Sequence, residues 1–333
     1  MLPDKTYQTI KEVLEKARNY VYNQANFAMV QAYWEIGRVI VEEEQKGKRR
    51  AEYGKKLIKE ISKRLTRDYG KGFDESNLRY IRLFYLSFPK CDSLRHELTW
   101  THYRMIMRLD QENIRNFYMI ESINNKWSTR ELDRQINSLL YERISLSRDK
   151  EGAKKLSLKG QEVLEPRDIL KDPFVLEFLD LKENYSEKDV EEKIINRLKE
   201  FLLELGKGFS FVGRQKRITV DGDHYYIDLV FYNYLLKCFV LVDLKMGKLT
   251  PKDIGQMDFY VRFFDKEERL KEDNPTVGII LCKDKKKMMI KYTLLEESKQ
   301  VFASKYKLYL PTEDELKKEL DYYIYDESTS EKD

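Results

Sequence analysis

Two aspartates and a lysine stand in one apolar stretch of the sequence, HYYIDLVFYNYLLKCFVLVDLKMG. The stretch is typical of two strands joined by a short connection, and we expect a hairpin that is symmetric about the Leu235–Leu236 bond. In that register Asp228 faces Asp243. Because side chains alternate along a strand, Lys245 shares the face of Asp243. Directly opposed residues have Cβ atoms about 4.5–5.5 Å apart, which suits two ligands of one small cation.

This arrangement indicates metal-dependent hydrolysis of a phosphodiester. Burying two carboxylates side by side is costly unless a cation neutralises them. Two oxygen ligands plus water commonly hold Mg²⁺, and the backbone carbonyl of Leu244 can add a third, so we expect Mg²⁺ or Mn²⁺. Lys245, its pKa lowered by the metal, can then orient and deprotonate the attacking water or stabilise charge on the phosphate. The alternative is a structural Asp–Lys pair near the end of a half-exposed hairpin.

A helix expected over about residues 187–205 offers a further carboxylate. Its apolar stripe consists of Val190, Ile194, Leu198, Phe201 and Leu205. At about 100° per residue, Glu191 falls inside the stripe and Glu192 at its edge. A carboxylate inside a buried stripe needs a partner, and the metal site on the sheet is the natural one. The alternative is that Glu191 pairs with a nearby Lys or Arg.

The elements that must position these residues form an α/β pattern from residue 174 onward. Thr250 and Pro251 are a good N-cap and first-turn pair for a helix over about 250–265. The last residues, DESTSEKD, are typical of disorder. Besides the helix near 187–205, the expected elements are strands near 209–220, 224–233, 237–246 and 276–283, a short strand near 305–310, and a terminal helix after Pro311.

The N-terminal part of the chain has helical periodicity throughout. A helical pattern over 5–45 is followed by a second helix, a break at Gly70 to Gly72, and a helix that Asp74 or Ser76 can cap. Three short helices then end in STRELDRQI, which has a capping-box spacing between Ser128 and Glu131. These three helices resemble a helix-turn-helix unit, whose last helix enters the major groove of DNA. Arg130, Arg134 and Gln135 would lie near its exposed face. The alternative is a plain helical bundle with a solvated polar face.

Composition sets the class of protein. The net charge of +4 is uneven, because residues 1–150 carry 29 Lys+Arg against 21 Asp+Glu. A basic half that attracts phosphates beside a half that gathers carboxylates fits a nucleic-acid enzyme, although two ordinary solvated surfaces would also give this balance. Three scattered cysteines indicate free thiols in a reducing compartment. Without an 18-residue apolar run or a signal-peptide pattern, we expect a cytoplasmic protein with no membrane partner.

Several motifs resemble those of a known family. The segments FLLELGKGFSFVGRQ, YYIDLVFY, VDLKMGKLTPKDIGQMDFY and NPTVGIILCKD are similar to the YhcG-type family of PD-(D/E)XK nucleases, and AYWEIGRVIVEEEQ, GFDESNLRYIRLFY and LTWTHYRMIMRLD to its N-terminal helical domain. The resemblance covers nearly the whole chain. It makes Asp228, Asp243 and Lys245 the catalytic strand residues and Glu191 the helix acid, with Glu192 as the fallback.

The resemblance also implies residues that touch the substrate. Gln256 and Tyr260, one helical turn apart, would line the cleft, and Arg214 and Gln215 would reach substrate phosphate. The chain departs from the family pattern in two places. It has Asp243 where Glu is commoner, which shortens the ligand by one methylene, and Ile227 where a proline usually precedes the first aspartate.

The expectation for the whole chain is an all-α, helix-turn-helix-like domain followed by a restriction-endonuclease-like α/β domain with a mixed central sheet. We expect a metal-dependent nuclease acting on nucleic acid, with DNA as the expected substrate. The rival is a non-cleaving binding or interaction module on the same fold, and the helical domain could instead form a homodimer. The expected divisions are a helical domain, a linker, a nuclease-like domain, and a terminal helix with a disordered tail, over 1–144, 145–165, 166–311 and 312–333.

Overall fold

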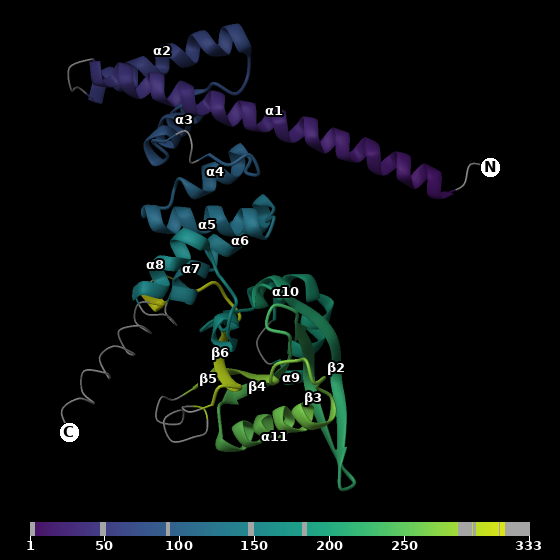
Figure 1. Cartoon of the computed structure of the whole chain (residues 1–333). Coiled ribbons are helices and arrows are strands. Elements are labelled where there is room, and N and C mark those ends of the chain that lie inside the picture. Colours follow the sequence, from purple (N-terminus) through teal and green to yellow (C-terminus); the bar gives the residue numbers. More distant parts are fainter. Residues whose placement is uncertain are drawn as a thin grey trace, which may run out of the picture. The chain divides into compact units, whose positions relative to one another are not determined.

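The computed structural model of the chain divides into two compact units, Met1–Asp133 and Arg134–Asp333. It is coloured along the sequence in Figure 1. None of the helices in the described part of the chain is long and apolar enough to cross a bilayer. The structure describes residues 4–46, 51–90, 94–145, 150–181, 185–285, 295, 298–312 and 314–316.

The first unit is helical, as the sequence predicts. Gly70 has a positive φ of 82° and Gly72 one of 113°, so the chain turns there between the second and third helices. Asp74 rather than Ser76 caps the third, because its side chain accepts the N–H of Asn77. The helices are α1 (Asp4–Lys46), α2 (Ala51–Tyr69), α3 (Glu75–Ser87), α4 (Trp100–Ile106), α5 (Glu112–Asn124) and α6 (Thr129–Asn137), the last of which extends into the second unit.

Packing of α1, α2 and α3 forms a core of this unit around Leu78 and Ile81 of α3, with Ile40 of α1 and Ile58 of α2. The N-terminal turns of α1 are different, since residues 5–25 are all exposed. In Figure 1 this part of α1 extends beyond the helices that cover its C-terminal half. The exposed turns therefore owe little of their stability to packing within the unit.

The second unit is built on a mixed sheet of six strands in the order β1-β6-β5-β4-β3-β2. Strands β2, β3 and β4 are antiparallel neighbours, whereas β4, β5, β6 and β1 run parallel. This is the mixed central sheet that the sequence predicts. The strands are β1 (Phe174–Val175), β2 (Phe209–Val220), β3 (Asp223–Asn233), β4 (Cys238–Lys248), β5 (Val277–Asp284) and β6 (Val301–Lys307).

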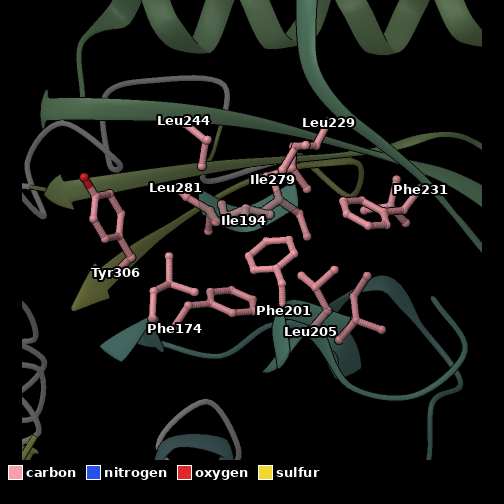
Figure 2. Close-up of a cluster of buried hydrophobic side chains, with 14 of the residues drawn as sticks. Phe174, Ile194, Phe201, Leu205, Leu229, Phe231, Leu244, Ile279, Leu281 and Tyr306 are labelled. Atoms are coloured by element: carbon pink, nitrogen blue, oxygen red, sulfur yellow. The ribbon is translucent and has the colours of Figure 1, made fainter. Parts of the chain in front are cut away.

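Helices cover both faces of the sheet. On one face, α9 (Glu187–Asn196) and α10 (Leu198–Leu205) pack Ile194 and Phe201 against Leu229, Phe231 and Leu244, a core drawn in Figure 2. On the other face lies α11 (Pro251–Glu267). Its N-cap is Thr250 and its first residue is Pro251, as predicted.

Two expectations for the elements of this unit need correction. The helix expected over 187–205 is broken at Arg197, with a φ of −121°. The strand expected near 305–310 is β6 (Val301–Lys307), which begins earlier. Its position is set by pairing with β5 and not by the local apolar pattern YKLYL of residues 306–310. Only residues 314–316 of the terminal helix are described, and the predicted disordered tail lies outside the described residues. Two cysteines, Cys238 and Cys282, are buried free thiols, as predicted, whereas Cys91 lies outside the described residues.

The segment expected to be a linker, 145–165, contains a helix. The second unit includes α7 (Leu140–Ser145) and α8 (Lys150–Lys159). Leu156 of α8 is buried at 1% exposure, while Leu158 is 66% exposed. A single buried leucine among lysines gives too weak a periodicity to indicate a helix from sequence. The boundary between the two units lies between residues 133 and 134, within α6. The segment 145–165 therefore belongs to the second unit.

Candidate active site

The two central strands carry the predicted hairpin register. β3 and β4 are antiparallel, with Val230 opposite Leu241, and their backbone pairing ends where Leu229 meets Val242. Leu229 and Val242 both contribute to the core on the side of α9 and α10, as the alternation of side chains predicts. The register expected from the symmetric hairpin is therefore confirmed.

Asp228 stands one residue beyond the last backbone pair, where the same register would place it opposite Asp243. Its Oδ2 accepts the backbone N–H of Leu244 at 2.8 Å, so a side-chain oxygen takes the position of a backbone acceptor. Because the N–H and the carbonyl of one strand residue point to the same side, the carbonyl of Leu244 also points toward β3. Asp228 and the Leu244 carbonyl thus approach the same edge of β4.

Asp243 is buried, with 2% of its surface exposed, and its Oδ2 lies 2.8 Å from Nζ of Lys245. Burial raises the pKa of Asp243, and the neighbouring carboxylate of Asp228 raises it further, to about 7, against the lowering effect of Lys245. The charged form of Asp243 is therefore poorly stabilised by the protein alone. A cation close to both carboxylates would stabilise it.

Lys245 is a cation in this arrangement. Burial lowers its pKa, but the charge and hydrogen bond of Asp243 and the charges of Glu187 and Asp228 outweigh that effect, so the pKa is raised overall. The lowered pKa expected for Lys245 assumed a bound metal beside it. The protein's own groups hold Lys245 as a positive charge next to Asp243.

Glu191 lies at the site, as its place in the apolar stripe predicts. It is 8% exposed, whereas Glu192 is exposed. Nε2 of Gln215 donates to Oε2 of Glu191 at 2.6 Å and to Oδ1 of Asp228 at 3.0 Å. Burial raises the pKa of Glu191, the hydrogen bond from Gln215 lowers it, and the charge of Asp228 raises it, with a net upward shift. One amide thus connects the carboxylate of α9 with the carboxylate of β3.

Gln215 does this from an unusual backbone conformation. Its φ is 48°, in the left-handed region that residues other than glycine rarely adopt. It stands between Arg214, which pairs with Leu229, and Lys216, which pairs with Ile227. The sequence-based expectation that Gln215 reaches substrate phosphate is at odds with this geometry, because its amide is already directed at two carboxylates.

A cavity of about 660 Å³ opens beside these carboxylates, lined by Glu187, Lys188, Glu191, Glu192, Arg214, Gln215 and Asp228. Sequence reasoning missed Glu187 and Lys188. Glu187 begins α9 directly after the N-cap Ser186, and its Oε1 accepts the N–H of Met246 at 2.9 Å. The capping-box sequence gives the start of the helix, but nothing local indicates that Glu187 reaches β4. Arg214 lines the cavity, where the expected contact with phosphate stays a prediction.

Gln256 and Tyr260 of α11 do not line this cavity. Tyr260 is fully buried, and its hydroxyl donates to the carbonyl of Tyr226 at 2.9 Å while accepting from Nε2 of Gln256 at 2.5 Å. Burial raises the pKa of Tyr260, and the charges of Asp243 and Asp228 also contribute. These two residues therefore hold α11 against β3 near the carboxylates, rather than lining the open cleft as expected.

Comparison with known proteins identifies the family. Residues 167–321 match the family described as YhcG PDDEXK nuclease domain, and residues 9–143 match the DUF1016 N-terminal domain. The Escherichia coli (strain K12) protein named "Putative nuclease YhcG" is 38% identical over 350 residues, covering 94% of this chain and 93% of that protein. The chain belongs to the YhcG family. The α/β unit is accordingly a PDDEXK, restriction-endonuclease-like domain.

Among solved structures, similarity extends over a part of the chain. A repair endonuclease from Pyrococcus abyssi is 21% identical with a TM-score of 0.27, over 39% of this chain and 50% of that chain. A complex of EndoMS with double-stranded DNA is 20% identical with a TM-score of 0.29, over 40% and 48%. The chain spans about half the length of each of these structures.

The donors of this candidate site fit a hard divalent cation. Within the described ranges, no three His, Cys, Asp or Glu side chains gather closely enough to hold a metal by themselves. The candidate donors are instead two carboxylates, Asp228 and Asp243, and one main-chain oxygen, the carbonyl of Leu244. Mg²⁺ is usually bound by one or two carboxylates, with water and substrate phosphate completing its shell. The poorly neutralised pair Asp228 and Asp243 is the feature of this structure that such an ion would relieve.

The two arginines expected on the exposed face of a recognition helix differ in their exposure to solvent. Arg130 is exposed near the start of α6, in the first unit. Arg134 has a side chain only 14% exposed, with Nε 2.9 Å from Glu177 and Nη2 3.2 Å from Glu204 in the second unit. Gln135 is also buried, at 1% exposure. The expectation that Arg134 contacts DNA is therefore corrected, because its guanidinium group already forms ion pairs with Glu177 and Glu204.

Proposed function

We propose that the chain is a divalent-metal-dependent nuclease that hydrolyses phosphodiester bonds of DNA, with Mg²⁺ or Mn²⁺ as the ion. One observation carries the proposal: Asp243 is 2% exposed beside Asp228 and 2.8 Å from Lys245, with a pKa raised to about 7. A carboxylate pair of this kind is costly in a protein that uses it for structure alone. The basic balance of residues 1–150 supports a polyanionic substrate.

Each residue has a separate part in the reaction. Asp228, Asp243 and the carbonyl of Leu244 would hold the ion, which polarises the phosphate and lowers the pKa of water when bound. Lys245 holds its proton beside Asp243 and places positive charge where negative charge develops on the phosphate. Glu191, kept in place by Gln215, orients water on the side of the cavity.

Arg214 supplies the cavity with a cation for the approaching backbone. Four of the residues that line the cavity are acidic, so a phosphate enters only if positive charge offsets their repulsion. Arg214 and Lys188 line the cavity, and the charges of both lower the pKa of Glu191. A phosphodiester bound there would lie beside Asp228.

The test is degradation of a substrate panel with Mg²⁺ or Mn²⁺. The panel contains linear duplex DNA, branched DNA, single-stranded DNA and RNA. We expect the wild-type chain to cleave DNA, and Asp228→Asn and Lys245→Met to lose at least about 100-fold in rate, as removal of a charge-stabilising group does. Asp258→Asn, which removes a carboxylate of α11 paired with Arg262, serves as the matched control and should keep full activity.

The rival is a module of the same fold that binds without cleaving. Equal cleavage by the wild-type chain, Asp228→Asn and Lys245→Met would mean that a contaminant is responsible and would remove the catalytic assignment. Binding of DNA by all variants without cleavage under any metal condition would favour the rival. Cleavage of RNA alone would support the assignment as a hydrolase and would show that DNA is not its substrate.

Self-association of the helical unit is a separate proposal. In the exposed turns of α1, Tyr7, Ile10, Leu14 and Val21 follow the heptad spacing of a two-stranded coiled coil, and each is more than half exposed. A second copy of α1 would cover this stripe. Light scattering of the full chain should then give a dimer that Leu14→Glu converts to monomer. A wild-type monomer at high concentration would contradict this proposal.

A further inference from the structure

Two arginines of the helical unit converge on one tyrosine. The Cζ atom of Arg104 in α4 lies 4.5 Å from the ring centroid of Tyr80 in α3, and that of Arg108 lies 5.1 Å from it. Nη2 of Arg108 also donates to the hydroxyl of Tyr80 at 2.9 Å. Arg104 and Tyr80 are partly exposed and Arg108 is exposed, so solvent reaches the cluster.

Neither guanidinium group forms an ion pair with a carboxylate among the described residues, whereas five other arginines of the unit do. Arg104 lies in α4 and Arg108 lies two residues beyond the end of this helix at Ile106, and two like charges drawn to one ring repel each other. Burial cannot explain the arrangement, because Arg108 is exposed. The arginines that form ion pairs with carboxylates are Arg38, Arg64, Arg67, Arg79 and Arg82.

The pKa of Tyr80 reflects the positive charge of the two arginines. The charge of Arg108 lowers the pKa of Tyr80, and hydrogen bonds from Arg104 and Arg108 lower it further. The aromatic face attracts both guanidinium groups, but it carries no net charge and so does not neutralise them. A guanidinium has five donors in a planar fork, which suits the oxygens of a phosphate.

The surrounding packing fixes the cluster in position. Phe84 of α3 packs against Trp100 and Tyr103 of α4, with ring centroids 5.3 Å and 4.9 Å apart. The N-terminus of α4 is closed by a capping box between Thr99 and His102. Helices α3 and α4 therefore hold Tyr80 and the two arginines at a set separation. A site that is preorganised in this way loses little entropy when it binds an anion.

We propose that Arg104 and Arg108, held against Tyr80, form a phosphodiester-binding site of the helical unit that grips the backbone of duplex DNA. The proposal rests on the proposed function in that the same DNA is the substrate of the α/β unit. Contacts of this kind position a protein on the backbone without reading bases. The site therefore contributes affinity that is independent of sequence and falls as salt rises.

The experiment measures the binding of a labelled DNA duplex by the full chain, with EDTA present to prevent cleavage, over a series of KCl concentrations. Arg104→Gln/Arg108→Gln should weaken binding about 10-fold at roughly 0.1 M salt and reduce the slope of log K against log salt by about 1.8, as for two lost phosphate contacts. Arg64→Gln/Arg79→Gln is the matched control. It removes the same net charge from exposed arginines already paired with Glu60 and Glu75, and we expect a change of no more than about 2-fold.

Equal weakening by both double variants would overturn the proposal, because it would show a general effect of net charge. An unchanged salt slope for Arg104→Gln/Arg108→Gln would overturn it as well. Tyr80→Phe keeps the aromatic face and loses only the hydroxyl, so it should retain most of the affinity. Thermal unfolding of each variant shows whether the fold is kept, and Arg104→Lys/Arg108→Lys repeats the test with charge retained, where an intermediate affinity supports a planar phosphate contact.

Cleavage assays separate this proposal from the proposed function. If the wild-type chain cleaves DNA with Mg²⁺ while the binding curves of both double variants coincide with wild type, the phosphate site is wrong and the nuclease assignment stands. If no cleavage occurs but the salt slope falls only in Arg104→Gln/Arg108→Gln, the binding site stands and the catalytic assignment is wrong.

Discussion

Nε2 of Gln215 donates to Oδ1 of Asp228 over 3.0 Å, from a backbone with a φ of 48°. The same nitrogen lies 2.6 Å from Glu191. A non-glycine residue in the left-handed region costs of order 1–3 kcal/mol, and such residues persist at functional sites where their surroundings hold them in place. The strained position of Gln215 places one amide between two carboxylates that would otherwise repel each other.

Replacement of Gln215 by glycine should separate stability from activity. Glycine adopts the left-handed conformation without strain, so Gln215→Gly is expected to keep or slightly raise the midpoint of thermal unfolding. The loss of the amide should lower the cleavage rate or metal affinity about 10–100-fold, as for other groups that orient metal ligands. Thr219→Ala on the same strand is the control and should change neither. A loss of activity accompanied by an equal loss of folded protein would point to a purely structural role.

Addition of Mg²⁺ or Mn²⁺ should stabilise the folded chain. An ion that binds the folded state alone at 100 times its Kd contributes about 2.7 kcal/mol. The ion would neutralise Asp228 and Asp243, so Asp243→Asn should abolish the metal-dependent rise in unfolding temperature, whereas Asp258→Asn should keep it. Removal of metal by EDTA should reverse the rise in the wild-type chain. Identical curves for wild type and Asp243→Asn across the metal titration would show that the ion binds elsewhere or not at all.

The parts of the site that the sequence predicts are those set by local pattern. The register of β3 and β4 follows from the symmetric apolar hairpin, and the burial of Glu191 follows from the helical stripe. The start of α11 follows from Thr250 and Pro251. In each case the signal is local in the sequence, because strand alternation and helix capping are short-range effects.

The parts that sequence could not predict depend on partners far along the chain. Arg134 and Arg143 are directed at Glu204, which is 70 and 61 residues away. Glu187 reaches Met246 across 59 residues. The capping sequence that places Glu187 at the start of α9 contains no information about β4. A polar helix face and a face that meets buried carboxylates have the same pattern in sequence.

Protonation of Glu204 should control stability in acid. Its side chain is fully buried with that of Arg143, at an N–O distance of 2.5 Å. Burial raises the pKa of Glu204, but the charges of Arg143, Lys171 and Arg134 outweigh it and lower the pKa from 4.5 to about 2. A lowered folded-state pKa gives stability that is present above about pH 4.5 and is lost as the pH falls toward 2.

The variant Glu204→Gln tests this dependence. It leaves buried arginines without their carboxylate and should cost about 3–5 kcal/mol near pH 7. The difference from wild type should stay constant above about pH 5 and shrink as the pH falls toward 2, measured by denaturant unfolding at each pH. Glu200→Gln, one turn earlier in the same helix and with its side chain 37% exposed, is the control, with an expected effect under about 1 kcal/mol. A difference that grows in acid would contradict the assigned direction of the pKa shift.

The same ion-pair network predicts where the α/β unit can be separated from the rest of the chain. The family match for the nuclease domain begins at residue 167, yet Arg134 and Arg143 lie before it and meet Glu204, whose side chain is 0% exposed. A fragment that begins at residue 167 would bury this carboxylate with Lys171 as its remaining cation. We therefore expect a fragment of residues 167–333 to aggregate or unfold, and a fragment of 128–333, which keeps α6 and α7, to unfold cooperatively. Circular dichroism and thermal unfolding of the two fragments check this. A cooperative transition at the same temperature in both would show that the arginines before residue 167 are dispensable for folding.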